Sequence, residues 1–261
     1  MVQPVRVDYQ IAGEGPAVFL THGVGARRQV WDGVIAKLAP HFRCISYDLR
    51  GHGNSEGATA PLGLAEFAAD LEALRAELGI EQAHFVGHSL GGMIAPTYAR
   101  AHPERVKSLA LICTAAFRSP EAAANGARFV EKLYAEGMPG ILETMLGRWF
   151  TDEFRRDHPE IVELRKQQML NADQRVYRET YKVFATTDMG SWLHEITART
   201  LVTTGEFDPG CGPALNEKIA AALPHSELVI LPALRHSVLV EAPDLVGDLL
   251  LRFLLSSAAS G

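Results

Sequence analysis

Short β-rich runs alternate with longer helical patterns through the first half of this chain. Such alternation is typical of a parallel sheet with helices on both faces. In the clearest helical pattern, Leu64 to Leu78, apolar residues recur at steps of three and four, and Gly79 marks its end. The sequence therefore predicts an α/β fold with a doubly wound core. The strand candidates are Val5–Ile11, Ala17–Leu20, Phe42–Tyr47, Ala83–Val86, Ser108–Cys113, Thr200–Thr204 and Glu227–Leu231.

The alternation stops after Cys113 and resumes at Thr200. Between Ser119 and about Leu193 the chain carries helical patterns separated by glycine and proline, without a convincing strand. This stretch is predicted to be an all-helical insertion into the α/β core.

Charge and hydropathy restrict the class of partner. The 261 residues include 25 basic and 31 acidic ones, for a net charge of −6, and no run of like charges occurs. This balance argues against nucleic-acid binding and against a basic membrane-surface protein, both of which need concentrated Lys and Arg. We find no secretory leader pattern and no apolar run of membrane-spanning length, so we expect a cytoplasmic protein that acts on a small molecule.

The three cysteines, Cys44, Cys113 and Cys211, are an odd number and do not have metal-ligand spacing. We expect them to be small buried residues, and we expect neither a metal site nor a cofactor.

The stretch Ala83 to Gly92 carries most of the chemical information. An apolar strand runs into Gly87-His88-Ser89-Leu90-Gly91, a G-x-S-x-G pattern, and a helix follows. A turn this sharp strains the serine backbone, so the positions two before and two after Ser89 must lack side chains. Ser89 is thereby predicted to stand clear of the sheet as a nucleophile.

A serine nucleophile needs a base, and the base needs a third group that fixes its tautomer. His236 follows the last strand candidate by a short loop, and Asp208 follows the strand before it, so both should lie at the carboxyl edge of the sheet. The chain order Ser89, Asp208, His236 is the order typical of this turn. His88 is a weaker candidate for the base, and Glu206 and Asp48 are weaker candidates for the acid.

A second glycine-rich turn, His22-Gly23-Val24-Gly25, follows the strand candidate Ala17–Leu20. It is suited to present a backbone N–H to the site. Together with the turn at Ser89 it predicts an oxyanion hole formed by the N–H groups of Val24 and Leu90.

With these motifs the chain resembles the α/β-hydrolase superfamily over essentially its whole length. The matching pieces are His22-Gly23, Asp48 to Gly53, Gly87 to Gly92, Gly205 to Asp208 and Arg235-His236-Ser237. The resemblance implies a mostly parallel eight-stranded sheet flanked by helices, with a helical cap inserted after strand six. It places the core at residues 1–116 and 194–261 and the cap at residues 117–193.

A closer resemblance is to 3-oxoadipate enol-lactonases and related bacterial carboxylesterases. It rests on Trp31-Asp32, on Ala101 to Val106, on Thr114-Ala115-Ala116 and on the run Met145 to Thr151. Enol-lactonases usually carry Leu before the nucleophile and Met after it, where this chain has His88 and Leu90. They also tend to carry Asn-Ser where Thr21-His22-Gly23 stands here.

These observations predict a cofactor-free serine hydrolase that cleaves a small carboxylic ester or lactone through an acyl-enzyme. A hydrolase of carbon–carbon bonds in ring-cleavage products, a perhydrolase or a cofactor-free haloperoxidase would share the triad, and a ligand sensor is a further alternative. A substrate with a free carboxylate would need a cation, for which Arg148, Arg118 and Lys132 are candidates. The predicted pocket residues are Phe117, Leu142, Met145, Trp149 and Val238.

Overall fold

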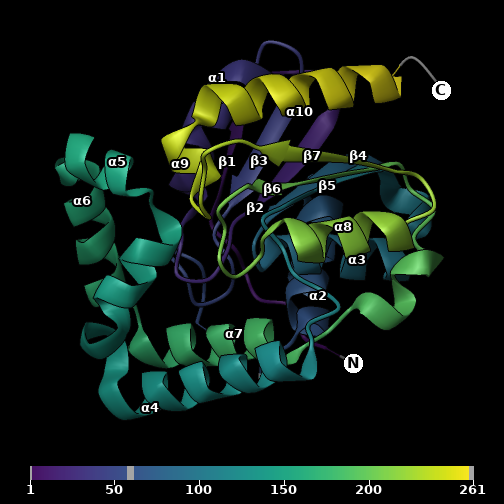
Figure 1. The fold of residues 1–261 in the computed structure, drawn as a ribbon. Helices are drawn as coiled ribbons and strands as arrows, with labels where there is room; N and C mark the ends of the chain where they lie inside the picture. The colour runs from purple at the N-terminus through teal and green to yellow at the C-terminus, as the bar shows by residue number, and fades with distance from the viewer. Residues whose placement is uncertain (1, 58–61, 259–261) are drawn as a thin grey trace.

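The computed structural model describes residues 2–57 and 62–258, and a single twisted sheet forms their centre (Figure 1). The strands lie in the order β1-β3-β2-β4-β5-β6-β7, and all neighbours are parallel except β1 and β3. Because the parallel strands run in the same direction, their carboxyl ends meet at one edge of the sheet. The strands are β1 (Tyr9–Ala12), β2 (Ala17–Thr21), β3 (Arg43–Tyr47), β4 (Ala83–His88), β5 (Val106–Ile112), β6 (Thr200–Gly205) and β7 (Ser226–Leu231).

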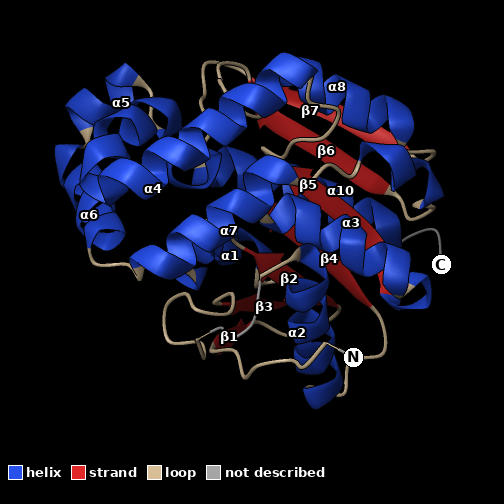
Figure 2. Cartoon of the chain, turned by 90° about the horizontal axis from the view of Figure 1, so that it is seen from below, coloured by secondary structure: helices blue, strands red, loops and turns tan. Residues whose placement is uncertain are grey.

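Helices cover both faces of the sheet (Figures 1 and 2). On one face, α1 (Asp32–Leu38) and α10 (Pro243–Ala258) pack against each other and bury an apolar cluster that includes Phe42 and Phe253. On the other face, α2 (Leu64–Glu77), α3 (Gly91–Ala101) and α8 (Pro213–Ala222) bury a second cluster. The doubly wound α/β core is therefore confirmed.

The predicted helical insertion also forms, between β5 and β6. It contains α4 (Pro120–Trp149), α5 (Asp152–Asp157), α6 (Pro159–Leu170) and α7 (Gln174–Thr186), which lie to one side of the sheet (Figure 2). Gly137 interrupts α4 with a φ of 67°. These helices have an apolar cluster of their own, and we call α4 to α7 the cap. The exact division into a core of residues 1–116 and 194–261 and a cap of 117–193 stays a prediction.

Short connecting helices complete the order of elements. They are the 3-10 helices η1 (Arg28–Trp31), η2 (Pro103–Arg105) and η3 (Gly190–Glu195) and the short helix α9 (Val238–Glu241).

Two expectations about the strands need correction. The described residues form seven strands where the resemblance implies eight, so the cap follows the fifth strand of this sheet and not the sixth. The first strand begins at Tyr9, because the preceding amide groups have side-chain partners: the N–H of Val5 donates to Asp70 and that of Asp8 donates to Ser55.

Within the described residues, the helices do not combine the length and the apolar character that a membrane span requires.

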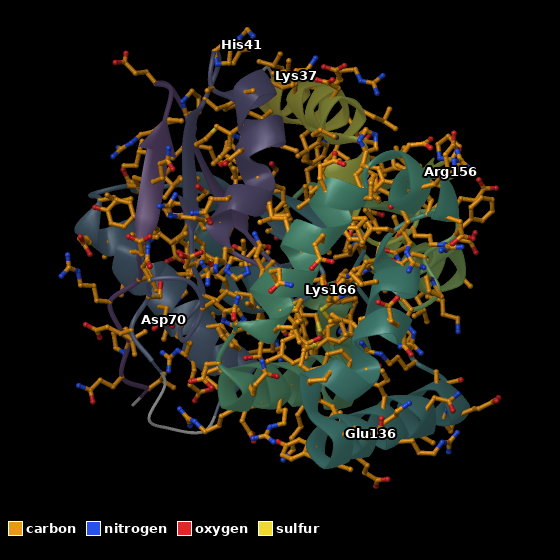
Figure 3. The ribbon with its side chains drawn as sticks, turned by 90° about the vertical axis from the view of Figure 1, so that its left-hand side faces the viewer. Lys37, His41, Asp70, Glu136, Arg156 and Lys166 are labelled. Carbon is orange, nitrogen blue, oxygen red and sulfur yellow. The ribbon has the colours of Figure 1, made fainter. Side chains whose placement is uncertain are left out.

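A buried ion pair joins the loop after β3 to α2. The guanidinium of Arg50 donates to both carboxylate oxygens of Asp70 at 2.6 Å, and both side chains are about 2% exposed (Asp70 is labelled in Figure 3). Removing one partner leaves an uncompensated buried charge.

We predict that Asp70→Asn lowers the free energy of unfolding by about 3 to 5 kcal/mol, measured by chemical denaturation. Glu195→Gln is the matched control, because it breaks the exposed Arg100–Glu195 pair and should cost less than about 1 kcal/mol. Equal losses in the two variants would contradict this account of the buried pair.

Candidate active site

Ser89 occupies a strained turn between β4 and α3. Its φ is +55°, in the left-handed region that residues with a side chain rarely adopt. The turn is held from both sides, because the Ser89 N–H donates to the Ile112 carbonyl at 2.8 Å and the Thr114 hydroxyl donates to the Ser89 carbonyl at 2.9 Å. A Cβ on Gly87 would overlap the Gly91 carbonyl group, which confirms the predicted need for glycine there.

His236 and Asp208 form a short hydrogen bond beside this turn. The Nδ1–H of His236 donates to Asp208 Oδ2 at 2.6 Å, while the N–H groups of Gly210 and Cys211 donate to Asp208 Oδ1. Burial alone would raise the pKa of Asp208, but the charge of His236 and these hydrogen bonds outweigh it and hold the pKa below its ordinary value. With Nδ1–H engaged in this way, His236 keeps Nε2 as the nitrogen that can accept a proton.

The imidazole of His88 packs against that of His236, with 4.9 Å between the ring centroids. The Nε2–H of His88 donates to the backbone carbonyl of His236 at 2.9 Å. Burial, followed by the charge of His236, lowers the pKa of His88 to about 3, so this ring stays neutral at neutral pH. His88 therefore contacts the ring and the backbone carbonyl of His236, whereas the Nδ1–H of His236 is bonded to Asp208.

The two weaker candidates for the acid have other partners. Glu206 accepts the N–H of Ala233 from an exposed position. Asp48 is buried and accepts the N–H groups of Arg28 and Asn54, which fixes the loop after β3.

Two buried histidines hold the turn that contains Val24. The Leu49 N–H donates to His22 Nε2 at 3.0 Å, so Nδ1–H of His22 donates to the Gly23 carbonyl. In the same way the Gly25 N–H donates to His52 Nε2 at 3.1 Å. Each Nε2 accepts, so each ring must be neutral.

This turn packs directly on the turn from Gly87 to Gly91, which we call the elbow. A Cβ added to Gly23 would lie 2.8 Å from the Ser89 Cβ. In the described part of the chain, neither the Val24 N–H nor the Leu90 N–H has a hydrogen-bond acceptor, so both can donate to a ligand.

Ser89, Asp208 and His236 line one cavity of about 480 Å³, between the carboxyl edge of the sheet and the cap. Its wall is predominantly apolar and aromatic. The cap contributes residues from α4, α6 and α7, and the core contributes the two turns and the loop of His236.

A family model described as the alpha/beta hydrolase fold matches residues 16–243. This chain belongs to the α/β-hydrolase family. The match spans both turns, the cap and the loops of Asp208 and His236, and it agrees with the sheet and its flanking helices.

Several relatives of this α/β hydrolase have named activities. It is 32% identical over 244 residues to 3-oxoadipate enol-lactonase 2 of Acinetobacter baylyi, covering 93% of this chain and 90% of that protein. A thermophilic esterase from Thermogutta terrifontis, solved with malate bound, has a TM-score of 0.88 at 30% identity, covering 97% of this chain and 94% of that one. The enol-lactonase from Burkholderia xenovorans LB400 also has a TM-score of 0.88, at 28% identity, covering 95% and 96%.

The predicted pocket residues of the hydrolase divide into two groups. Met145 and Trp149 line the cavity. Leu142 packs in the apolar cluster of the cap, Val238 packs in the cluster beneath α10, and Phe117 lies against Gly190. For these three, the interpretation as lining residues disagrees with their packing.

Sequence reasoning missed most of the cap's contribution to the cavity. Three aromatic residues that line the cavity lie one turn apart on α7: Tyr177, Tyr181 and Phe184. Their helical spacing is the sequence pattern that could have identified this face of α7. Arg165 of α6 also lines the cavity, and α6 offers no comparable pattern.

The loop of His236 is attached to the end of α4. The Arg235 guanidinium donates to the carbonyl groups of Gly147 and Phe150 at 2.8 Å, and the Ser237 N–H donates to the Trp149 carbonyl at 2.9 Å. The cap is therefore connected through backbone groups to the residues on either side of His236.

Two groups of side chains could bring three metal-ligating atoms within 4.8 Å of one another: His88, Cys113 and His236, and Asp208, Cys211 and His236. Burial raises the pKa of both thiols well above the ordinary value, which disfavours the thiolate form that binds metal ions. His236 and Asp208 are already bonded to each other, and the groups present fit proton transfer better than metal binding.

Neutral buried histidines make stability depend on pH. Burial, with smaller contributions from neighbouring arginines, lowers the pKa of His52 to about 4, against 6.5 for the ordinary group. Between these values the unfolded chain binds a proton that the folded chain excludes, so stability falls as the pH falls from 6.5 towards 4.

We predict that His52→Gln flattens the dependence of unfolding free energy on pH in this window, by up to about 1.4 kcal/mol per pH unit. Chemical denaturation at several pH values measures the slope. His41→Gln is the matched control, because the His41 side chain is exposed in the folded hydrolase. An unchanged slope in His52→Gln would contradict the assignment of a neutral buried ring.

Proposed function

We propose that this α/β hydrolase is a serine hydrolase that cleaves small carboxylic esters or lactones through an acyl-enzyme. The observation that carries the proposal is a strained serine and a bonded His–Asp pair lining the same cavity. A serine hydroxyl at its ordinary pKa is a poor nucleophile, and an adjacent base held in one tautomer is the arrangement that activates it.

In the proposed reaction Ser89 Oγ attacks the substrate carbonyl carbon while His236 Nε2 takes the hydroxyl proton. Asp208 keeps the proton on Nδ1 and stabilises the imidazolium that forms. His236 then gives its proton to the departing alkoxide. The acyl group stays on Ser89 until water, activated by the same histidine, releases the acid.

Negative charge develops on the carbonyl oxygen in both steps. The N–H groups of Val24 and Leu90 are proposed to hold it, since both lack another acceptor in the described chain. The start of α3 adds the positive end of a helix dipole. One such donor contributes about 10² to 10³ in turnover, so the packing of Gly23 on Ser89 would matter for the rate.

Small substrates fit the site better than long ones. A cavity of about 480 Å³ lies in the lower part of the range for small-molecule sites. The esterase and enol-lactonase relatives support an ester or lactone as substrate class.

We predict that Ser89→Ala lowers kcat for p-nitrophenyl butyrate by at least about 10⁴-fold, and that Asp208→Asn lowers it by about 10⁴-fold. Steady-state and single-turnover kinetics measure both, and the wild type should release a burst of nitrophenol when deacylation is the slower step.

Two matched controls accompany these variants. Ser191→Ala removes an exposed hydroxyl, and Glu206→Gln alters the other acid of the Asp208 loop; both should keep activity within about threefold of wild type. Full activity in Ser89→Ala would refute the serine mechanism. A large loss of activity in Glu206→Gln with a small loss in Asp208→Asn would assign the role of the acid to Glu206.

A further inference from the structure

His88 connects the elbow to the loop that carries the proposed base. It is the last residue of β4 and directly precedes Ser89, and its imidazole Nε2–H donates to the backbone carbonyl of His236 at 2.9 Å. The imidazole rings of His88 and His236 also pack against each other, with 4.9 Å between their centroids and 53° between their planes. A hydrogen bond and a ring contact therefore join the neighbour of the proposed nucleophile to the proposed base.

The loop around His236 has two sets of supports. Among the described residues, the hydrogen bond from His88 is the one that joins the elbow to this loop. The cap holds the loop through other groups, because the Ser237 N–H donates to the Trp149 carbonyl and Arg235 donates to carbonyl groups at the end of α4. Loss of the bond from His88 would therefore leave the loop attached to the cap but no longer bonded to the elbow.

The His88 ring stays neutral while the proposed reaction changes the charge of His236. His236 gains a proton when Ser89 attacks, and a second imidazolium beside it would oppose that gain. Burial and then the charge of His236 lower the pKa of His88 to about 3, with a smaller effect of Arg165 in the same direction, and the hydrogen bond to the His236 carbonyl and the Asp208 carboxylate offset them only in part. His88 therefore donates to the loop of the base without adding charge beside it.

The covalent link between His88 and Ser89 makes this contact a constraint on the distance from nucleophile to base. Neighbouring Cα atoms are about 3.8 Å apart. The Ser89 backbone is itself held at a φ of +55° by hydrogen bonds to the end of β5 and the loop after it. A ring that is bonded to the loop of His236 and attached one residue before Ser89 therefore limits how far the two side chains can separate.

Proton transfer is sensitive to a separation of this kind. A base must lie within about 3.2 Å of the group whose proton it takes. A displacement of about 1 Å can lower the rate by about 10²-fold, even when the altered residue does not take part in the chemistry. A side chain that fixes the place of His236 relative to Ser89 is therefore expected to affect turnover.

Two other roles for His88 fit its contacts less well. As the base it would need an Nε2 free to accept a proton, but that nitrogen donates to the His236 carbonyl, and Asp208 is bonded to His236. As a packing residue it would need no donor, yet its N–H is placed on a backbone carbonyl of the loop that carries the proposed base.

We propose that His88 is a positioning residue: through its Nε2–H and its ring contact it holds His236 where that residue can take the proton of Ser89. This inference rests on the proposed function, and it adds to the proposed triad a side chain that acts through His236. The hydrogen bond carries the larger share of this role, because the ring contact alone does not fix the loop backbone.

The test separates the donor from the ring. His88→Phe keeps an aromatic ring beside His236 but leaves its carbonyl without the donor, whereas His88→Gln keeps an N–H donor of similar reach. His88→Phe should lower kcat for p-nitrophenyl butyrate by about 10- to 100-fold and change KM by less than about threefold. His88→Leu, a second variant without a donor, should behave like His88→Phe. His88→Gln should keep kcat within about fivefold of wild type.

His84→Gln is the matched control. His84 is another buried histidine of β4, with its Nδ1 hydrogen-bonded to the Ser108 hydroxyl of β5 at 2.7 Å, and burial lowers its pKa to about 4. With kcat expressed per folded molecule, from chemical denaturation, this variant should stay within about threefold of wild type.

Three kinetic results would overturn the proposal. Equal losses of kcat in His88→Phe and His88→Gln would mean that the donor has no role. A loss in His88→Phe and His88→Leu that appears only in KM, or only in the folded fraction, would mean that His88 lines the cavity or supports the fold. An unchanged kcat in both variants would mean that the cap alone holds the loop.

A measurement without substrate separates this proposal from the serine mechanism. The short hydrogen bond between His236 Nδ1–H and Asp208 gives a far-downfield proton resonance, whose exchange with water can be followed by NMR. Exchange should be equally slow in wild type, Ser89→Ala and His88→Gln, and at least about tenfold faster in His88→Phe. An unchanged exchange rate in His88→Phe would overturn the positioning role. If exchange behaves as expected but esters are not hydrolysed, His88 holds His236 as proposed and the proposed hydrolysis fails.

Discussion

The close approach of backbone to backbone at Ser89 is the constraint on which the rest of the site depends. β4 ends and α3 begins within a few residues, and the Ser89 backbone is forced to a positive φ. At Gly87 and Gly91, on either side of it, the neighbouring backbone leaves no room for a side chain. Such strain persists only where surrounding contacts over-determine it. Here the bonds to Ile112, the last residue of the neighbouring β5, and to Thr114 in the loop after it hold the turn in place.

The other parts of the site are built around that turn. The Val24 turn packs on it through Gly23, and the neutral rings of His22 and His52 keep its carbonyl and amide groups oriented. The cap is attached at two points that matter for chemistry: Arg165 reaches the Val24 turn, and Arg235 holds the end of α4 beside His236. A shift of the cap would therefore move both the Val24 turn and the loop that carries His236.

The parts of this arrangement that leave a local signature could be predicted from the sequence. The elbow is one, because its steric demand requires glycine at fixed positions, and α2 is another, because its apolar residues recur at helical spacing up to the stop at Gly79. Val5 to Asp8 alternates like a strand, but its amide groups bond to side chains brought from elsewhere in the chain.

No sequence pattern points to Arg165, because its position in the cavity depends on a contact with Gly25, which lies 140 residues away in the chain. The sequence does not indicate which apolar residues of α4 face the cavity, because Leu142 packs in the apolar cluster of the cap and the course of α4 depends on the interruption at Gly137.

Covalent labelling with a fluorophosphonate tests whether Ser89 is the nucleophile. We expect one adduct per chain by intact mass, located on Ser89 by peptide mapping, with esterase activity lost in proportion to labelling. Asp208→Asn should slow the labelling, because the orientation of His236 is then impaired. Complete modification of Ser89 with activity retained, or inactivation with the adduct on another residue, would contradict the account.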